Sequence, residues 1–132
     1  MKRQLDLGFD VLMPAGILTA DEGEVLVVLS QHRGRDEAIP VAALAERTRL
    51  DGRRLQIIVK QLVEAHQVPI GTATRAPFGY YIIQSDEERR EVRDSMMHRA
   101  LSTMRRARAY DRGGWVAEMV GQVELGLGVV RK

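Results

Sequence analysis

Apolar residues recur at the three- and four-residue spacing of an amphipathic helix in four stretches of the chain. Two of these stretches begin with a capping box, in which a hydroxyl side chain and a glutamate satisfy the free amides of the first turn. The pairs are Thr19 with Glu22 and Ser85 with Glu88. Another stretch begins after Asp51, which is a favourable N-cap. We therefore predict helices over residues 19–32, 41–48, 51–66 and 85–110.

Between the third and the fourth predicted helix the pattern changes to that of extended chain. Val68–Ile70 is a short extended run, and Tyr80–Ile83 is rich in aromatic and β-branched residues. The residues between them, 71–79, include glycine and proline, so the two runs predict a β-hairpin with a long tip. Alternating apolar residues predict a further strand over 5–11. The last segment is ambiguous, because the apolar residues over 115–123 fit a helix and those over 123–129 fit a strand.

These elements predict an α+β fold that is mostly α, with a three-helix core, a β-hairpin and a long C-terminal helix. We expect a partly extended N-terminal arm over 1–18, a domain over 19–84, the long helix over 85–112 and a C-terminal tail over 113–132 that could contribute to a dimer. The predicted core consists of Leu26, Leu29, Leu44, Leu50, Leu55, Ile58, Leu62, Ile70, Tyr81 and Ile83.

Composition narrows the class of protein. The chain has 132 residues, of which 45% are hydrophobic and 29% are charged, as in an ordinary globular protein. It contains no cysteine, which excludes disulfide scaffolds and thiol nucleophiles, and no apolar run of membrane-spanning length. The N-terminus shows no secretory pattern, so we expect a cytoplasmic, nucleoid-associated protein without a membrane partner.

Residues 41–60 have the pattern of two helices joined by a tight turn. Apolar or small residues stand where two such helices would cross, at Leu44, Ala45, Leu50, Leu55 and Ile58. This segment resembles a helix-turn-helix, and its position before a hairpin follows the winged-helix plan. Arg49 occupies the turn, where glycine is frequent, and a left-handed backbone there costs about 1 kcal/mol.

Three motifs follow this segment: V-P-I at 68–70, G-Y-Y-I at 79–82 and S-D-E-E at 85–88. With them, the chain from Thr19 to Tyr110 resembles small winged helix-turn-helix proteins of prophages and mobile elements, which are similar to the DNA-binding module of biotin-ligase-type repressors. The resemblance implies that residues 19–84 form a winged helix and that the protein is a bacterial or phage transcriptional regulator. Such a protein binds double-stranded DNA through a major-groove helix and a wing. The residues after Arg112 lie outside the resemblance.

The third predicted helix has one apolar face and one polar face. With Leu55 at the centre of the buried face, the opposite face carries basic and amide side chains together with Ile57. Arginine can contact guanine, amides can contact adenine, and an apolar side chain can contact the thymine methyl group. The predicted DNA-binding residues, with the turn and the wing included, are Arg49, Arg53, Arg54, Gln56, Ile57, Lys60, Gln61 and Arg75. The alternative interpretation is an ordinary solvated helix face.

Charge gives this interpretation partial support. Of the 20 basic residues, 17 are arginine, which suits phosphate and guanine recognition but also follows from a GC-rich genome. Residues 33–75 hold eight basic and five acidic residues, a local net charge of +3. A second basic cluster, at Arg99, Arg105, Arg106, Arg108 and Arg112, is either a phosphate contact or a solvated face.

The long helix carries an apolar stripe that predicts a homodimer. The expected dimerisation residues are Val92, Met96, Met97, Leu101 and Met104. The apolar runs at 5–11 and 123–129 would add strands to the same interface. The alternative is a monomer in which the long helix folds back on its own domain and the tails fray.

Sequence motifs of enzymes are missing. His32, His66 and His98 are scattered without the spacing of metal ligands, and no glycine-rich phosphate loop or nucleophile elbow occurs. We therefore expect no catalytic residue, no metal, no cofactor and no small-molecule ligand. The alternative function is that of a winged-helix interaction module in replication, recombination or partition machinery.

Overall fold

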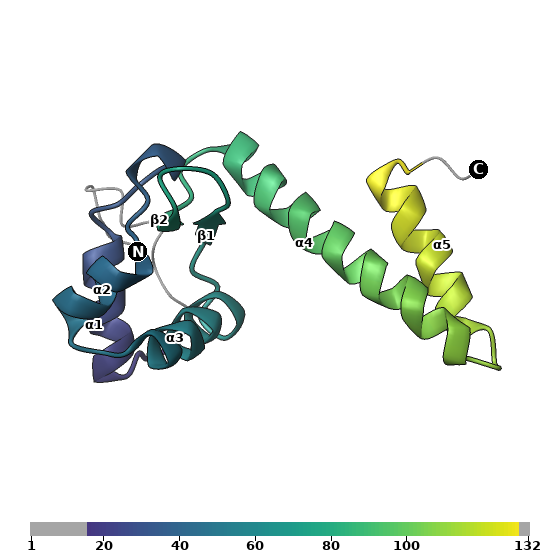
Figure 1. Ribbon diagram of the computed structural model, residues 1–132, viewed down its shortest axis with the longest axis horizontal. Helices are drawn as coiled ribbons and strands as arrows, with labels where there is room; N and C mark the ends of the chain where they lie inside the picture. Colours follow the sequence, from purple (N-terminus) through teal and green to yellow (C-terminus); the bar gives the residue numbers. More distant parts are fainter. Residues whose placement is uncertain (1–15, 130–132) are drawn as a thin grey trace. The chain divides into compact units, whose positions relative to one another are not determined.

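The computed structural model describes residues 16–129, which divide into two units (Figure 1). The N-terminal unit extends to Arg89 and the C-terminal unit begins at Arg90. The fold is α+β and mostly helical, with an antiparallel hairpin and a long helix near the C-terminus, as predicted. No helix within the described residues is long and apolar enough to cross a membrane.

Helices α1 (Ala20–Leu29), α2 (Val41–Thr48) and α3 (Gly52–Glu64) form the helical part of the N-terminal unit. The Thr19 capping box is confirmed, since the Thr19 hydroxyl accepts from the Glu22 amide and the Glu22 carboxylate accepts from the Thr19 amide. Helix α1 ends earlier than predicted, because Ser30 caps it and its hydroxyl binds the carbonyl of Val27. The short 3-10 helix η2 (Arg35–Glu37) lies between α1 and α2.

Strands β1 (Ile70–Ala73) and β2 (Gly79–Ile82) pair in antiparallel register, with Ile70 opposite Ile82. The hairpin is confirmed, but β1 takes in residues assigned to the loop, so the tip is shorter than predicted. Ile39 adds a further bridge to β2: its amide donates to the Tyr80 carbonyl at 2.8 Å, and the Tyr80 amide donates to the Ile39 carbonyl at 3.0 Å.

The core of the N-terminal unit joins all three helices to the hairpin. Eight of the ten predicted core residues are buried, whereas Leu26 and Leu50 are only half-buried at its edge. Tyr80 and Tyr81 are adjacent in β2, and both are buried. Their strand is covered on one side by the chain at Ile39 and lies against the helices, which leaves neither tyrosine at the surface.

Helix α4 (Asp86–Ala107) begins in the N-terminal unit and continues into the C-terminal unit. Its capping box is half formed: the Glu88 amide donates to the Ser85 hydroxyl at 3.1 Å. The Glu88 carboxylate instead accepts from the backbone amides of Gln84 and Arg35, each at 2.9 Å. The bond from Arg35 attaches the start of α4 to η2, and the bond from Gln84 caps the helix locally.

The C-terminal unit pairs the later part of α4 with α5 (Trp115–Leu127), after the 3-10 helix η3 (Arg108–Tyr110). The strand alternative for 123–129 is therefore wrong up to Leu127, which belongs to the helix. Leu101 on α4 is buried against Val116 and Val120 of α5. An ion pair of 2.7 Å joins Arg105 to Glu124, which is itself buried. The predicted strand over 5–11 lies outside the described residues.

Candidate nucleic-acid interface

A left-handed residue makes the turn between α2 and α3. Arg49 has φ 61° and ψ 30°, and its amide donates to the carbonyl of Ala45. The predicted left-handed conformation at this non-glycine position is therefore confirmed. Thr48 supports the turn, because its buried hydroxyl donates to the Leu44 carbonyl at 2.7 Å. The turn leaves the Arg49 side chain exposed at the start of α3.

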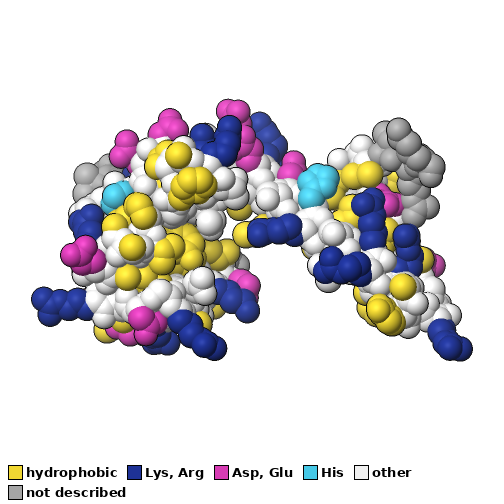
Figure 2. Space-filling model, in the orientation of Figure 1, with side chains coloured by type: hydrophobic (Ala, Val, Ile, Leu, Met, Phe, Trp, Pro, Cys, Tyr) yellow, Lys and Arg dark blue, Asp and Glu magenta, His cyan; other side chains and the backbone are white. Residues whose placement is uncertain are grey.

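Helix α3 buries one face and exposes the other. Asp51 caps the helix by accepting from the Arg54 amide at 2.7 Å. The buried side chains are Leu55, Ile58, Val59 and Leu62. The polar face is exposed as predicted, at Arg53, Arg54, Gln56, Ile57, Lys60 and Gln61. The part of the surface at α3 carries projecting basic side chains (Figure 2).

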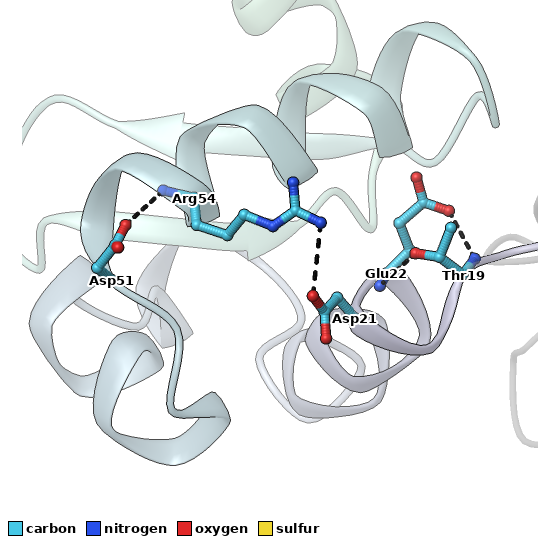
Figure 3. A network of polar contacts seen from close by, with 5 residues as sticks. All are labelled: Thr19, Asp21, Glu22, Asp51 and Arg54. Atoms are coloured by element: carbon cyan, nitrogen blue, oxygen red, sulfur yellow. Dashed lines mark hydrogen bonds and ion pairs between the residues drawn. The ribbon is translucent and has the colours of Figure 1, made fainter.

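Arg53 and Lys60 differ from Arg54 in whether the side chain forms an ion pair. Within the described residues neither forms an ion pair, so their charges are available to an external anion. The Arg54 guanidinium instead lies 3.5 Å from the Asp21 carboxylate on α1, as Figure 3 shows. Both side chains are about half exposed. An exposed ion pair of this kind contributes roughly 0–1 kcal/mol to the free energy of unfolding. Arg54 thus links α3 to α1 in the free protein.

The hairpin tip consists of residues 74–78 between β1 and β2. Arg75 is exposed there, and Phe78 is exposed as well despite being aromatic. Gly79 follows with φ 134°, and a Cβ atom at this position would overlap the carbonyl of Ile39. The close approach of Ile39 therefore requires glycine at the end of the tip, where it sets the point from which the tip leaves the sheet.

A buried contact that sequence analysis missed connects α1 to the end of α3. The Nε2 atom of His66 lies 3.2 Å from Oε1 of Glu22, and both side chains are largely buried. The sequence predicted only a capping role for Glu22 and no partner for His66. No pattern of neighbouring residues pointed to their pairing. The contact helps to hold α3 in place, although neither residue reaches the exposed face.

The predicted dimerisation residues separate into two groups. Leu101 is buried against α5 of the same chain and Met104 packs at the edge of that cluster, so these two side chains lie within the C-terminal unit and not on its exposed surface, where the dimer prediction placed them. Met96 and Met97 remain exposed, and Val92 is half-buried.

No protein-family model matches the chain, and no curated protein and no solved structure matches it either.

Proposed function

We propose that the N-terminal unit is a winged helix-turn-helix domain and that the protein binds double-stranded DNA in a sequence-specific manner, as a bacterial or phage transcriptional regulator. One observation carries this proposal. Helix α3 exposes a continuous row of basic, amide and β-branched side chains opposite its buried face, directly after a tight turn. A helix with such a row can enter the major groove and contact base edges.

Each exposed side chain has a role that its chemistry suits. Arg53 pairs with guanine, Gln56 and Gln61 with adenine, and Ile57 contacts a thymine methyl group. Lys60, with its flexible side chain, and Arg49, at the turn before α3, contact phosphates of the DNA backbone. Arg75, at the hairpin tip, contacts the minor groove or a neighbouring phosphate. Arg54 joins this set only if it leaves Asp21, which costs little for a pair so exposed.

A selection of bound sites from random duplex DNA, followed by affinity measurements on the enriched site, tests the proposal. The variant Arg53→Ala/Arg54→Ala/Lys60→Ala should lose affinity and specificity for that site. The variant Arg106→Ala/Arg108→Ala/Arg112→Ala removes the same number of charges from the C-terminal unit and should keep the specificity. Failure to enrich any duplex, or equal losses in the two variants, would contradict sequence-specific recognition through α3.

A protein-interaction role is the second candidate, and two residues on the same face favour it. Ile57 is 43% exposed, and Glu64 on the same face is an acidic residue that a DNA backbone would repel. If the selection enriches no duplex, this face would instead dock a protein partner, with Ile57 as the apolar anchor.

A further inference from the structure

The C-terminal unit exposes large apolar side chains that its own packing does not cover. Trp115 is 62% exposed, Met96 47%, Met119 43% and Met97 38%. Apolar side chains reach the surface of the α4–α5 pair among basic ones (Figure 2). A cluster of exposed large apolar residues on a small unit marks an interaction surface more often than single exposed residues do.

Met96, Trp115 and Met119 belong to two rows of exposed residues, one row on each helix, and Met97 lies outside them. On α4 the row is Met96, Ala100, Thr103 and Ala107, and on α5 it is Trp115, Met119, Gln122 and Gly126. Both rows have the alternating four- and three-residue spacing of a helix–helix seam. Every residue in them is exposed, and we name them together the outer seam.

The two rows lie on the same side of the α4–α5 pair. Viewed down each helix from its N-terminus, the row lies roughly 100° around the axis from the residues that contact the other helix. The direction of this rotation is the same for α4 and α5. That contact is made by Leu101 on α4 and by Val116 and Val120 on α5. Because α5 runs antiparallel to α4, equal rotations in the same direction place both rows on the same face of the helix pair. The outer seam is therefore a single face made by two helices, and its large apolar side chains are Met96, Trp115 and Met119.

The C-terminal unit buries few apolar side chains of its own. Among the residues that the structure describes, its cluster has only Leu101, Val116 and Val120 as buried members, with Met104, Val123, Leu127 and Val129 at the edge. Two helices with so little shared core need further packing, since most helical stability in proteins comes from tertiary contact. A second pair of helices laid on the outer seam would supply it as a four-helix bundle.

We propose that the outer seam binds a second copy of this chain, with α4 of one copy lying over α5 of the other. Charge complementarity supports this occupant. Arg99 flanks the outer edge of the row on α4, and Glu118 flanks the outer edge of the row on α5. Neither has an ion-pair partner within the described residues. A two-fold axis parallel to the helices places Arg99 of each copy beside Glu118 of the other copy, so the interface is self-complementary. This proposal does not depend on DNA binding.

Light scattering during size-exclusion chromatography at micromolar concentration gives the first test. The full chain should have twice the 14.8 kDa mass of one copy, and Met96→Glu/Met119→Glu should halve that mass. Val27→Glu changes an exposed apolar residue on α1 and should leave the dimer intact. A full chain at the mass of one copy, or a dimer that survives the double substitution, would overturn the proposal.

Crosslinking gives a second test that does not depend on disrupting the fold. The chain contains no cysteine, so introduced thiols are unique. A short bismaleimide should join two chains of Arg99→Cys/Glu118→Cys, whereas each single variant should stay uncrosslinked. Crosslinking of Arg99→Cys alone would show α4 against α4 and would refute the proposed arrangement. DNA affinity for a single half-site is measured in parallel, so that failure of the dimer is distinguished from failure of the proposed function.

Discussion

The guanidinium of Arg54 on α3 lies 3.5 Å from the carboxylate of Asp21 on α1, although its neighbour Arg53 has no such partner within the described residues. Two adjacent arginines on one helix therefore have different surroundings before any ligand arrives. Arg53 can meet a base without breaking an interaction, whereas Arg54 must first leave Asp21. The difference gives the proposed DNA contact a direct test.

Arg53→Ala should weaken binding to the selected site by about 1–3 kcal/mol and relax the preference at one base position, as loss of a bidentate guanine contact does. Arg54→Ala should weaken binding less, because its side chain begins in a contact with α1. Fluorescence anisotropy with the selected site and with single-base variants of it measures both effects. A larger loss of specificity for Arg54→Ala than for Arg53→Ala would assign the base contact to Arg54 instead.

Arg49→Gly should raise the free energy of unfolding by about 1 kcal/mol, because glycine adopts the left-handed conformation at φ 61° without a Cβ penalty. The same substitution should weaken DNA binding through loss of a phosphate contact. Arg49→Ala is the matched control, since it removes the charge but keeps the Cβ atom. It should weaken DNA binding equally without stabilising the fold, as urea unfolding and anisotropy would show. Equal stability of the two variants would contradict strain at the turn.

Gly79→Ala should destabilise the N-terminal unit by at least about 2 kcal/mol, because its backbone conformation is strained for alanine and the new methyl group meets Ile39. Gly23→Ala is the control, since this glycine lies within α1 with no atom close to the position of a Cβ. That substitution should stabilise the fold by roughly 0.5–1 kcal/mol. Thermal or urea unfolding measures both, and a tolerated Gly79→Ala would show that Ile39 is not held against β2.

Burial raises the pKa of the Tyr80 phenol above its ordinary value of 10.0. The folded protein thus holds the neutral phenol, while the unfolded chain loses the proton at lower pH. The stability from this group is fully present below about pH 10 and is lost as the pH rises through the raised folded value. The free energy of unfolding should fall more steeply above about pH 10 in the native chain than in Tyr80→Phe. Equal slopes in urea titrations would contradict this assignment.

Patterns of residues close together in the chain determined the helices and much of the proposed site. The capping signals at Thr19 and Asp51, the left-handed turn at Arg49 and the exposed face of α3 depend on residues within a few positions of one another. The geometry of a helix converts such spacing directly into a buried face and an exposed face. For that reason the division of α3 into Leu55 and its buried neighbours, opposite Arg53 and Lys60, could be predicted before the structure.

The tertiary structure alone decided the contacts between residues distant in the chain. Asp21 and Arg54 stand 33 positions apart, and Glu22 meets His66 because α1 crosses the end of α3. The burial of both Tyr80 and Tyr81 required the chain at Ile39 to pair with β2, which no local pattern of the strand encodes. Helical spacing over 115–123 gives way to strand spacing over 123–129, so the local pattern could not assign one structure to the whole segment. Val116 and Val120 pack on Leu101 when they lie on one face of a helix, and this contact decided the structure of the tail.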